Sequence, residues 1–309
     1  METNNLSISV IILTYNEELH IKRCILSAKK YAENIHIIDS YSSDETVTIA
    51  KSLNVDVLQN KFENYSKQFN WALDNIKSNS DWILRLDADE YLEEDLVFEI
   101  KEKLPKLNEN INGINFKRKH IFMNKWIRYG GRYPLTLLRL WKRKYGKIED
   151  RWMDEHIILQ KGEIVTFRNN FCDHNLKNLN FFINKHNWYA SREALDIILV
   201  ELKKGDKRNQ LLENKTSFNA LFKRIIKEKI YNRLPIGIRS FAYFVYRYIF
   251  LLGFLDGREG LIYHFLQGFW YRFLVDCKVY EYRNEIKNIN NYDEKLKIIS
   301  KVSGLNIKQ

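Results

Sequence analysis

Cysteine is scarce in this chain, which has three cysteines among its 309 residues. Cys24, Cys172 and Cys277 are far apart in the sequence and form no CxxC pair. An odd number of widely spaced cysteines excludes the disulfide framework of small secreted proteins and the common zinc-binding patterns. We therefore expect reduced thiols in a cytosolic setting.

The N-terminus lacks the features of a cleaved export signal. Residues Met1–Ser7 contain no basic residue, and the apolar run Ile8–Leu13 is too short for the hydrophobic core of a signal. The run passes directly into polar residues from Thr14 onward. We expect a buried strand here and no export by a cleaved signal.

Acidic residues are outnumbered by basic ones, 39 against 50, which gives a formal net charge of +11. Such a balance favours an anionic partner, which is a nucleic acid, a lipid surface or a phosphorylated small molecule. The hydrophobic fraction of 45% is sufficient for a real core. The length accommodates one large domain and an extension.

Four apolar runs alternate with segments of helical spacing in the first hundred residues. The runs begin near residues 8, 35, 55 and 82, and the amphipathic segments cover about 18–31, 42–53 and 65–77. This alternation predicts an α/β fold with a mostly parallel sheet flanked by helices. Ser42 and Glu45 have the spacing of a capping box at the start of the second helix.

Polar side chains follow three of the four predicted strands, at the point where each strand ends. Ligands of parallel α/β sheets bind beyond these carboxyl ends, so we expect one shared site. The residues concerned are Thr14, Tyr15, Asn16 and Glu17 after the first strand, Asp39 after the second, and Asp87 and Asp89 after the fourth.

The Asp87-Ala88-Asp89 sequence predicts a divalent metal site. In extended backbone alternate side chains share a face, so both carboxylates can reach one ion. Carboxylate oxygens suit Mg²⁺ or Mn²⁺, which proteins commonly hold with one or two carboxylates and the phosphates of the substrate. An Asp-x-Asp pair also occurs at helix caps and on solvated surfaces, and its place at a strand end favours the metal site.

Three ordered motifs in residues 7–100 resemble the family 2 glycosyltransferases. They are Ser9–Glu18 (SVIILTYNEE), Ile37–Thr46 (IIDSYSSDET) and Trp82–Glu90 (WILRLDADE). The resemblance implies a GT-A fold that binds a nucleotide-diphosphate sugar, with a UDP-sugar as the leading donor. It also implies that Thr14–Glu17 line the nucleotide, that Asp39 contacts the base, and that Asp87 and Asp89 hold the ribose and the metal.

Inverting sugar transfer requires a general base for the acceptor hydroxyl. Relatives place an acidic residue in the region of Glu149–His156, where Asp154 and Glu155 are equal candidates. The alternative is a charged helix start. The resemblance also suggests His156 or His174 as a further metal ligand, although a lone histidine is more often structural.

The segment that contains Arg132, Tyr133, Arg139 and Trp141 resembles the acceptor side of these enzymes. The aromatic rings offer flat faces for a sugar, and the guanidinium groups offer forked donors for hydroxyl or phosphate oxygens. Ordinary packing in the core is the alternative for all four residues.

The last third of the chain is basic and then aromatic, and we assign residues 1–210 to the catalytic domain and 211–309 to a helical, membrane-associating extension. Residues 221–239 contain six basic residues and one acid, a net charge of +5, which gives at most about 5 kcal/mol of attraction to an anionic surface. Arg247 and Asp256 interrupt the apolar run, so helices that lie in the interface fit better than a span. Packing on the catalytic domain or on another subunit is the alternative.

The tail of the chain, Phe254–Gly260 and Tyr271–Asp276, resembles bacterial enzymes that build lipopolysaccharide core and surface polysaccharides. This resemblance implies a lipid-linked or glycan acceptor at the cytoplasmic face of the plasma membrane. A nucleotidyltransferase is disfavoured because Thr14–Glu17 contains no glycine. A nucleic-acid partner is disfavoured because no reader module is present.

Overall fold

The computed structural model describes residues 6–148, 157–206 and 235–305. The chain forms two compact units, Met1–Leu176 and Lys177–Gln309. This division lies earlier than the predicted one after residue 210. The reason is that helix α5 (Leu179–Asp206), which we had assigned to the catalytic domain, packs along helix α9 (Tyr271–Ile286) of the second unit.

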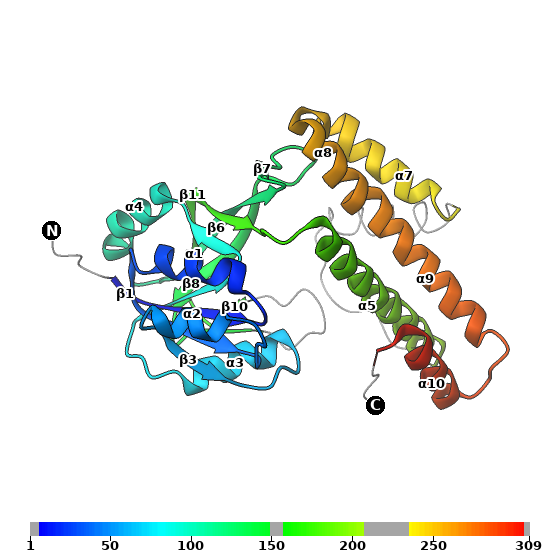
Figure 1. Cartoon of the computed structure of the whole chain (residues 1–309), viewed down its shortest axis with the longest axis horizontal. Helices are drawn as coiled ribbons and strands as arrows, with labels where there is room; N and C mark the ends of the chain where they lie inside the picture. The colour runs from blue at the N-terminus through cyan, green and yellow to red at the C-terminus, as the bar shows by residue number, and fades with distance from the viewer. Residues whose placement is uncertain (1–5, 149–156, 207–234, 306–309) are drawn as a thin grey trace. The chain divides into compact units, whose positions relative to one another are not determined.

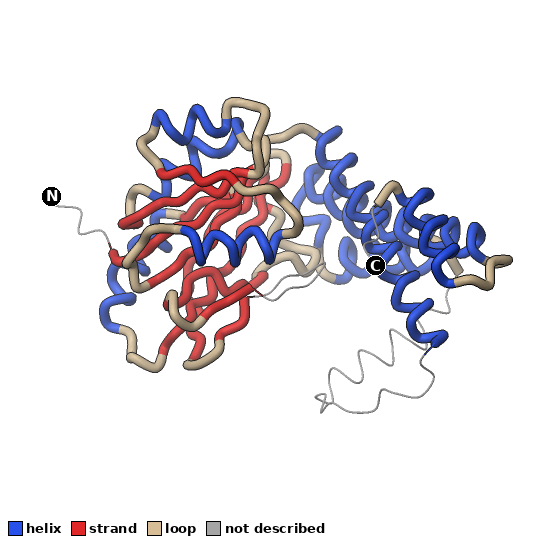
Figure 2. The backbone as a smooth tube through the Cα atoms, turned by 90° about the horizontal axis from the view of Figure 1, so that it is seen from below, coloured by secondary structure: helices blue, strands red, loops and turns tan. Residues whose placement is uncertain are grey.

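The first unit is built on a mixed sheet (Figures 1 and 2). Its strand order is β3-β2-β1-β4-β8-β6-β11-β5, and β1 is parallel to both β2 and β4. The strands are β1 (Leu6–Thr14), β2 (Ala32–Asp39), β3 (Asp56–Gln59), β4 (Trp82–Asp87), β5 (Glu90–Leu92), β6 (Ile111–Phe122), β7 (Lys125–Trp126), β8 (Leu135–Lys142), β9 (Gly146–Ile148), β10 (Ile157–Leu159) and β11 (Glu163–His174).

Helices cover both faces of this sheet. They are α1 (Glu18–Ala28), α2 (Thr46–Ser52), α3 (Tyr65–Asn75) and α4 (Glu94–Lys103). Val10 and Ile12 of β1 pack with α1, α2 and α4, whereas Ile11 packs with α3 on the other face. Alternate residues of a strand point to opposite faces, which explains why β1 is apolar throughout.

The predicted fold class is confirmed, and the four predicted strands are β1 to β4. The antiparallel strand β8, which pairs with β4 and β6, makes the sheet mixed. The predicted capping box is wrong, because α2 begins at Thr46 without a side-chain cap from Glu45. The Ser42 hydroxyl instead donates to Asp39.

The described part of the second unit is helical, as predicted for the C-terminal region. It contains α5, α7 (Ile238–Val245), the π-helix η3 (Tyr246–Phe250), η4 (Gly253–Asp256), α8 (Gly257–Tyr263), the π-helix η5 (His264–Trp270), α9 and α10 (Tyr292–Ser303). Its core joins α5, α9 and α10 through side chains such as Ala194, Val279 and Ile299.

Candidate functional site

The carboxyl ends of β1, β2 and β4 form one edge of the sheet, which we call the polar rim. Thr14 of β1 lies level with Asp39 of β2, and Leu13 lies level with Asp87 of β4. The structure therefore places the two carboxylates on the strands that flank β1. Asp89 follows β4 in the short turn that leads into β5.

Asp39 is fully buried, and its carboxylate accepts four hydrogen bonds from neighbouring residues. The Thr14 hydroxyl and the Gln59 amide each donate at 3.0 Å. The Ser42 backbone amide donates at 2.9 Å, and the Ser42 hydroxyl donates as well. Asp39 therefore positions the rim, and its predicted contact with a nucleotide base requires it to release one of these donors.

The loop after β1 is joined to the loop after β2. The backbone amide of Asn16 donates to the Ser42 hydroxyl at 2.9 Å, and the backbone amide of Glu17 donates to the Thr46 hydroxyl at 2.7 Å. Asn16 and Tyr41 both have positive φ, of 54° and 60°. Left-handed backbone at a residue other than glycine costs free energy and is concentrated at functional sites.

Two aromatic rings stand exposed beside this junction. Tyr15 is 60% exposed and Tyr41 is 59% exposed. We predicted a role for Tyr15 but none for Tyr41. The motif Ile37–Thr46 contains Tyr41, and its left-handed backbone is the signal that identifies it.

Glu17 is oriented by a buried histidine. His20 is fully buried, and its Nδ1 lies 2.6 Å from the Glu17 carboxylate. The Leu176 backbone amide donates to Nε2 of the same ring at 2.8 Å. Since Nε2 accepts this hydrogen bond, Nδ1 carries the proton and donates it to Glu17.

Asp87 lies beside the phenol of Tyr65 and the guanidinium group of Arg85. The Tyr65 hydroxyl donates to the Asp87 carboxylate at 2.9 Å, and the Arg85 guanidinium stacks on the Tyr65 ring at 4.1 Å. Loss of hydration alone would raise the pKa of Asp87, but Arg85, Arg139 and the Tyr65 hydroxyl hold it below its usual range. Asp87 is therefore ionised at neutral pH, as a metal ligand must be.

Glu90 and Arg139 form a buried ion pair beneath the polar rim. Arg139 Nη2 donates to the Glu90 carboxylate at 2.5 Å, and the two side chains are 4% and 3% exposed. The second Glu90 oxygen accepts from the Asp87 amide at 2.9 Å. Burial raises the pKa of Glu90 well above its usual range, the nearby Asp87 also raises it, and Arg139 opposes the rise.

Arg139 was predicted to bind the acceptor, and the structure contradicts this role. Its guanidinium is buried against Glu90 and the Phe171 ring and is closed to solvent. Among the described residues no hydrogen-bond partner lies at its Nε or Nη1. Arg139 therefore supplies positive potential under the rim and holds Glu90 in place.

Trp141 was also predicted to stack on the acceptor, and this prediction is wrong. The ring is fully buried, packs against Phe69 at 5.9 Å between centroids, and fills the space beside Gly146. Arg132 and Tyr133 are half-buried. The Tyr133 hydroxyl donates to Asn170 at 2.9 Å, and the ring meets Trp126 edge-on.

Asp89 and His174 lie together at the end of β11. The Asn175 amide donates to the Asp89 carboxylate at 2.9 Å, and the His174 backbone amide donates to the Asp89 carbonyl at 3.0 Å. Arg23 reaches both residues from α1, at 3.3 Å from the Asp89 carbonyl and 3.1 Å from His174 Nδ1. Burial lowers the pKa of His174, and Arg23 lowers it further.

These groups suit a divalent cation by their chemistry. Asp87 and Asp89 offer hard oxygen ligands. Both ring nitrogens of His174 already have partners, Arg23 at Nδ1 and Asn124 at Nε2, each at 3.1 Å, so His174 has to release one of them before it binds a metal. Within the described ranges no three His, Cys, Asp or Glu side chains meet as a ready-made cage. The arrangement fits an ion that takes its remaining ligands from substrate phosphates and water.

Asp154, Glu155 and His156 lie outside the described residues. The candidates for the general base and one of the candidate metal ligands therefore remain predictions.

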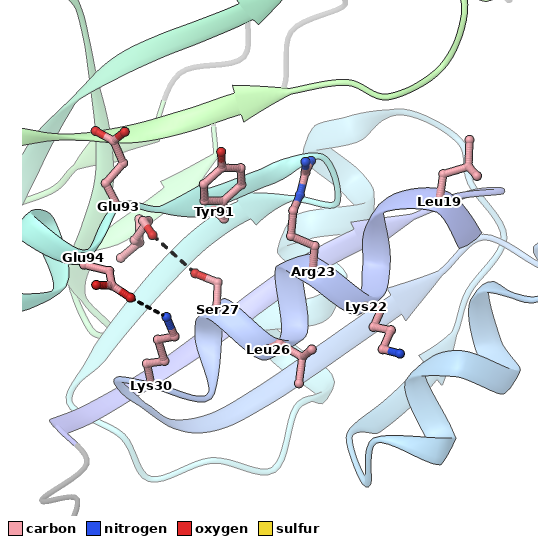
Figure 3. A pocket seen from close by; sticks show the side chains of 10 residues that line it. Leu19, Lys22, Arg23, Leu26, Ser27, Lys30, Tyr91, Glu93 and Glu94 are labelled. Atoms are coloured by element: carbon pink, nitrogen blue, oxygen red, sulfur yellow. Dashed lines mark hydrogen bonds and ion pairs between the residues drawn. The ribbon is translucent and has the colours of Figure 1, made fainter. Parts of the chain in front are cut away.

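A pocket of about 730 Å³ lies beside the site, between α1 and β5 (Figure 3). Arg23 extends from α1 and stacks on the Tyr91 ring at 4.8 Å. Lys30 pairs with Glu94 at 2.9 Å along the wall of the pocket. None of its lining residues was predicted, and Arg23 connects this pocket with Asp89 and His174.

Sequence reasoning missed several residues that build the site. Arg85 and Glu90 lie inside the motif Trp82–Glu90, so their proximity was available as a signal. His20 and Arg23 lie on a helix and gave no signal, because each has a partner more than 150 residues away, Leu176 for His20 and His174 for Arg23. Tyr65 reaches Asp87 from α3, 22 residues earlier in the chain.

Replacing Asp39 by asparagine is expected to lower the free energy of unfolding by about 1–3 kcal/mol, because an amide cannot accept all four of the donors that surround it. Nucleotide affinity should fall as the two loops separate. Urea unfolding and calorimetric titration measure these effects. The matched control is Asp74→Asn on the exposed side of α3, which should change stability by less than about 0.5 kcal/mol.

The family model and the relatives found by comparison with known proteins are all glycosyltransferases. The family model described as Glycosyl transferase family 2 matches residues 9–196, which is more than half of the chain. A glycosyltransferase of Rickettsia typhi is 26% identical over 292 residues, which cover 91% of this chain and 89% of that protein. The lipopolysaccharide core biosynthesis glycosyltransferase LpsC of Rhizobium meliloti is 32% identical over 107 residues, 33% of this chain and 37% of that protein. Glucosyl-3-phosphoglycerate synthase of Mycobacterium tuberculosis aligns at a TM-score of 0.38 with 15% identity, over 58% of this chain and 75% of that chain.

Proposed function

Since this chain belongs to glycosyl transferase family 2, we propose that it transfers a sugar, with inversion, from a nucleotide-diphosphate donor to a surface-glycan acceptor. The observation that carries the proposal is the polar rim. Thr14 and Asp39 on one side and Asp87 and Asp89 on the other lie at the ends of adjacent parallel strands. Ligands of open α/β sheets bind at such an edge.

The donor side of the site is the junction of the two loops after β1 and β2. The exposed rings of Tyr15 and Tyr41 offer faces on which a nucleobase stacks. Asp39 and Glu17 are held from behind, by Thr14 and His20, so the loops are ordered before the donor binds. A uridine diphosphate sugar is the leading candidate.

A divalent cation, Mn²⁺ or Mg²⁺, is the expected cofactor. Asp87 and Asp89 would hold it, with His174 as a third candidate ligand and His156 as a fourth. When bound, such an ion neutralises the charge that develops on the departing diphosphate. The chain's own contribution is to keep Asp87 ionised through Arg85 and Tyr65.

The general base is Asp154 or Glu155. Two other acidic groups near the rim already lie beside guanidinium groups, which supports this assignment. Glu90 is paired with Arg139, and the Asp173 carboxylate lies 3.0 Å from His120 and 3.4 Å from Arg118. The base removes the proton of the acceptor hydroxyl as the new glycosidic bond forms.

The acceptor is a lipid-linked or polysaccharide glycan, and the reaction takes place at the cytoplasmic face of the plasma membrane. The partial similarity to LpsC supports a surface glycan. The net charge of +11 and the exposed aromatic side chains of the second unit support a membrane surface. Arg132 and Tyr133 are the remaining candidates for acceptor contacts.

Calorimetric titration of a panel of nucleotide sugars tests this function. We expect binding and slow hydrolysis of one donor with Mn²⁺ present, and loss of both after the metal is removed with EDTA, because the diphosphate charge is then unopposed. Added Mn²⁺ should restore them. A chain that binds no nucleotide sugar with any divalent metal would contradict the proposal.

A further inference from the structure

The segment 236–273 of the second unit, which we call the apolar hairpin, has an inverted distribution of polarity. Its exposed side chains are apolar or aromatic, with Phe250 71% exposed and Ile238 55% exposed. Between residues 235 and 279, all of which the structure describes, Arg258 is the one charged residue among the exposed positions. Soluble proteins seldom expose so continuous an apolar surface without a partner.

Three ionisable side chains of the hairpin lie in its interior, whereas Arg258 is exposed and Glu259 is half-buried. Arg247 is 3% exposed, Asp256 2% and His264 0%. Arg247 donates to Gln267, and so joins the π-helices η3 and η5. At the base of the hairpin Arg239 pairs with Asp276, which also accepts from the fully buried Ser240 at 3.3 Å.

The turn of the hairpin is closely packed. A Cβ atom at Gly253 would lie 2.8 Å from the His264 ring, and one at Gly260 would lie 2.4 Å from the Asp256 side chain. Leu252 adopts a left-handed backbone with φ of 58° to enter the turn. The two arms therefore form one ordered body, and the exposed residues at its tip include Leu252, Phe254 and Leu255.

We infer that the apolar hairpin inserts into one leaflet of a lipid bilayer and leaves it on the side from which it entered. This inference deepens the membrane association proposed above and rests on that proposal. In hydrocarbon, polar groups have to be satisfied inside the protein while apolar side chains face outward. Arg247, Asp256 and His264 lie beneath the apolar surface, where Arg247 donates to Gln267 and the His264 ring lies 3.6 Å from the Asp256 carboxylate, so the protein keeps these groups away from lipid.

Length decides between insertion and crossing. In the described part of the chain no single helix has the length and composition of a membrane span, but 238–250 and 253–286, bent by 72°, together meet that test. The first arm has 13 residues and is about 20 Å long at 1.5 Å per residue, which is less than a hydrocarbon core of about 30 Å. The first arm is therefore too short to cross by itself, which favours a segment that enters and leaves on the same side over a broken span.

Aromatic and basic residues at the base of the hairpin indicate how deeply it inserts into the bilayer. Trp270, Tyr280, Arg272 and Lys278 lie toward the base of the second arm, where aromatic and basic side chains are favoured at the headgroups. The exposed Arg258 near the tip has a long side chain that can extend to the headgroups. A tilted hairpin places both the base of the second arm and the Arg258 side chain near the headgroups. An upright hairpin would carry Arg258 toward the middle of the bilayer.

A second copy of this chain is the competing occupant. A protein interface covers one face of an element, whereas the exposed apolar residues of the hairpin occur on both arms and on the turn, for example Phe241, Leu255 and Phe265. A bilayer covers all of these at once. The lipid leaflet therefore accounts for more of the exposed surface.

Flotation of the full-length chain with vesicles of phosphatidylglycerol and phosphatidylethanolamine tests the inference. We expect flotation to persist in about 1 M salt, where the screening length falls to about 3 Å and simple electrostatic docking is lost. Phe250→Glu/Leu255→Glu should reduce partitioning at least about tenfold. The control Phe98→Glu, at a 68% exposed position on α4, should float as the parent does.

Depth is measured on Leu252→Cys in a Cys277→Ser background, labelled with a fluorophore. We expect quenching by lipids brominated in the acyl chains, and no reaction of the unlabelled thiol with an impermeant reagent trapped inside the vesicles. The same label at Val302→Cys on α10 should stay unquenched. Reaction from the lumen would show a span and overturn the inference.

Two further results would also overturn it. One is flotation of the double variant at the level of the parent. The other is a parent that does not float but forms a dimer, which the double variant converts to a monomer. The double variant lies outside the polar rim and should retain nucleotide-sugar hydrolysis. If the proposed function is wrong, neither the parent nor the double variant hydrolyses a nucleotide sugar. If only the insertion is wrong, both proteins hydrolyse the sugar and the flotation result differs from the expected one.

Discussion

Asp89→Asn is expected to lower sugar transfer about 10³-fold, because a metal ion that stabilises the leaving diphosphate contributes several kcal/mol to the transition state. The substitution removes the charge and leaves the local structure. The Asn175 amide can still donate to an amide oxygen, and the contacts from Arg23 and His174 go to the Asp89 backbone carbonyl.

Steady-state kinetics with Mn²⁺ and a titration of Mn²⁺ binding measure this effect, and thermal unfolding should change little. The matched control is Asp81→Asn, an exposed position just before β4 begins, at the opposite edge of the sheet. Activity of the Asp89 variant within about threefold of the parent would refute a metal site at the rim.

Arg139→Met is expected to lower the free energy of unfolding by about 3–5 kcal/mol at pH 8, since Glu90 is then left as a buried charge without its counter-ion. Glu90 already has a raised pKa, and loss of Arg139 raises it further. A carboxyl group whose pKa is higher in the folded than in the unfolded state binds more protons when folded, so stability falls as the pH rises through this range.

The loss in the Arg139 variant should therefore shrink as the pH is lowered toward the usual carboxyl range. Urea unfolding at several pH values measures it. Arg139→Met/Glu90→Gln should recover much of the stability at pH 8, because the uncompensated charge is gone. Lys144→Met, in the exposed loop after β8, is the control, and an Arg139 deficit that is independent of pH would contradict the role given to Glu90.

The polar rim was predictable because its signals are local. An apolar run followed at once by Thr14, Asp39 or Asp87 reports both a buried strand and the place where it ends. Parallel strands then bring these ends together without further information. Apolar runs that end in polar residues also located β1 to β4. They did not reveal β8 as an antiparallel neighbour of β4, because the direction of pairing depends on the course of the chain between the strands.

Arg139 and Trp141 were misassigned for an identifiable reason. The pairing of β6 and β8 shifts from Ile114 opposite Leu140 to Asn115 opposite Leu138, which leaves Arg139 as the extra residue of a β-bulge. A bulge changes the direction of side chains along a strand. The alternation pattern alone therefore cannot show that Arg139 meets Glu90, nor that Trp141 packs on α3.

Arg247 and Asp256 show the same limit in the second unit. In the sequence they interrupt an apolar run and disfavour a membrane span. In the structure their side chains are buried between the arms, and the partner of Arg247 is 20 residues away. A charge inside a hairpin leaves its outer surface apolar, which a hydropathy average does not detect.

The hydrogen bond from Leu176 to His20 has a practical consequence for dissecting the protein. Leu176 is the last residue of the first unit, and its amide fixes the tautomer that orients Glu17. A fragment that stops short of this residue removes the donor to Nε2 and leaves the imidazole free to rotate. Any isolated catalytic half should therefore retain Leu176, because the end of its chain helps to shape the beginning of its active site.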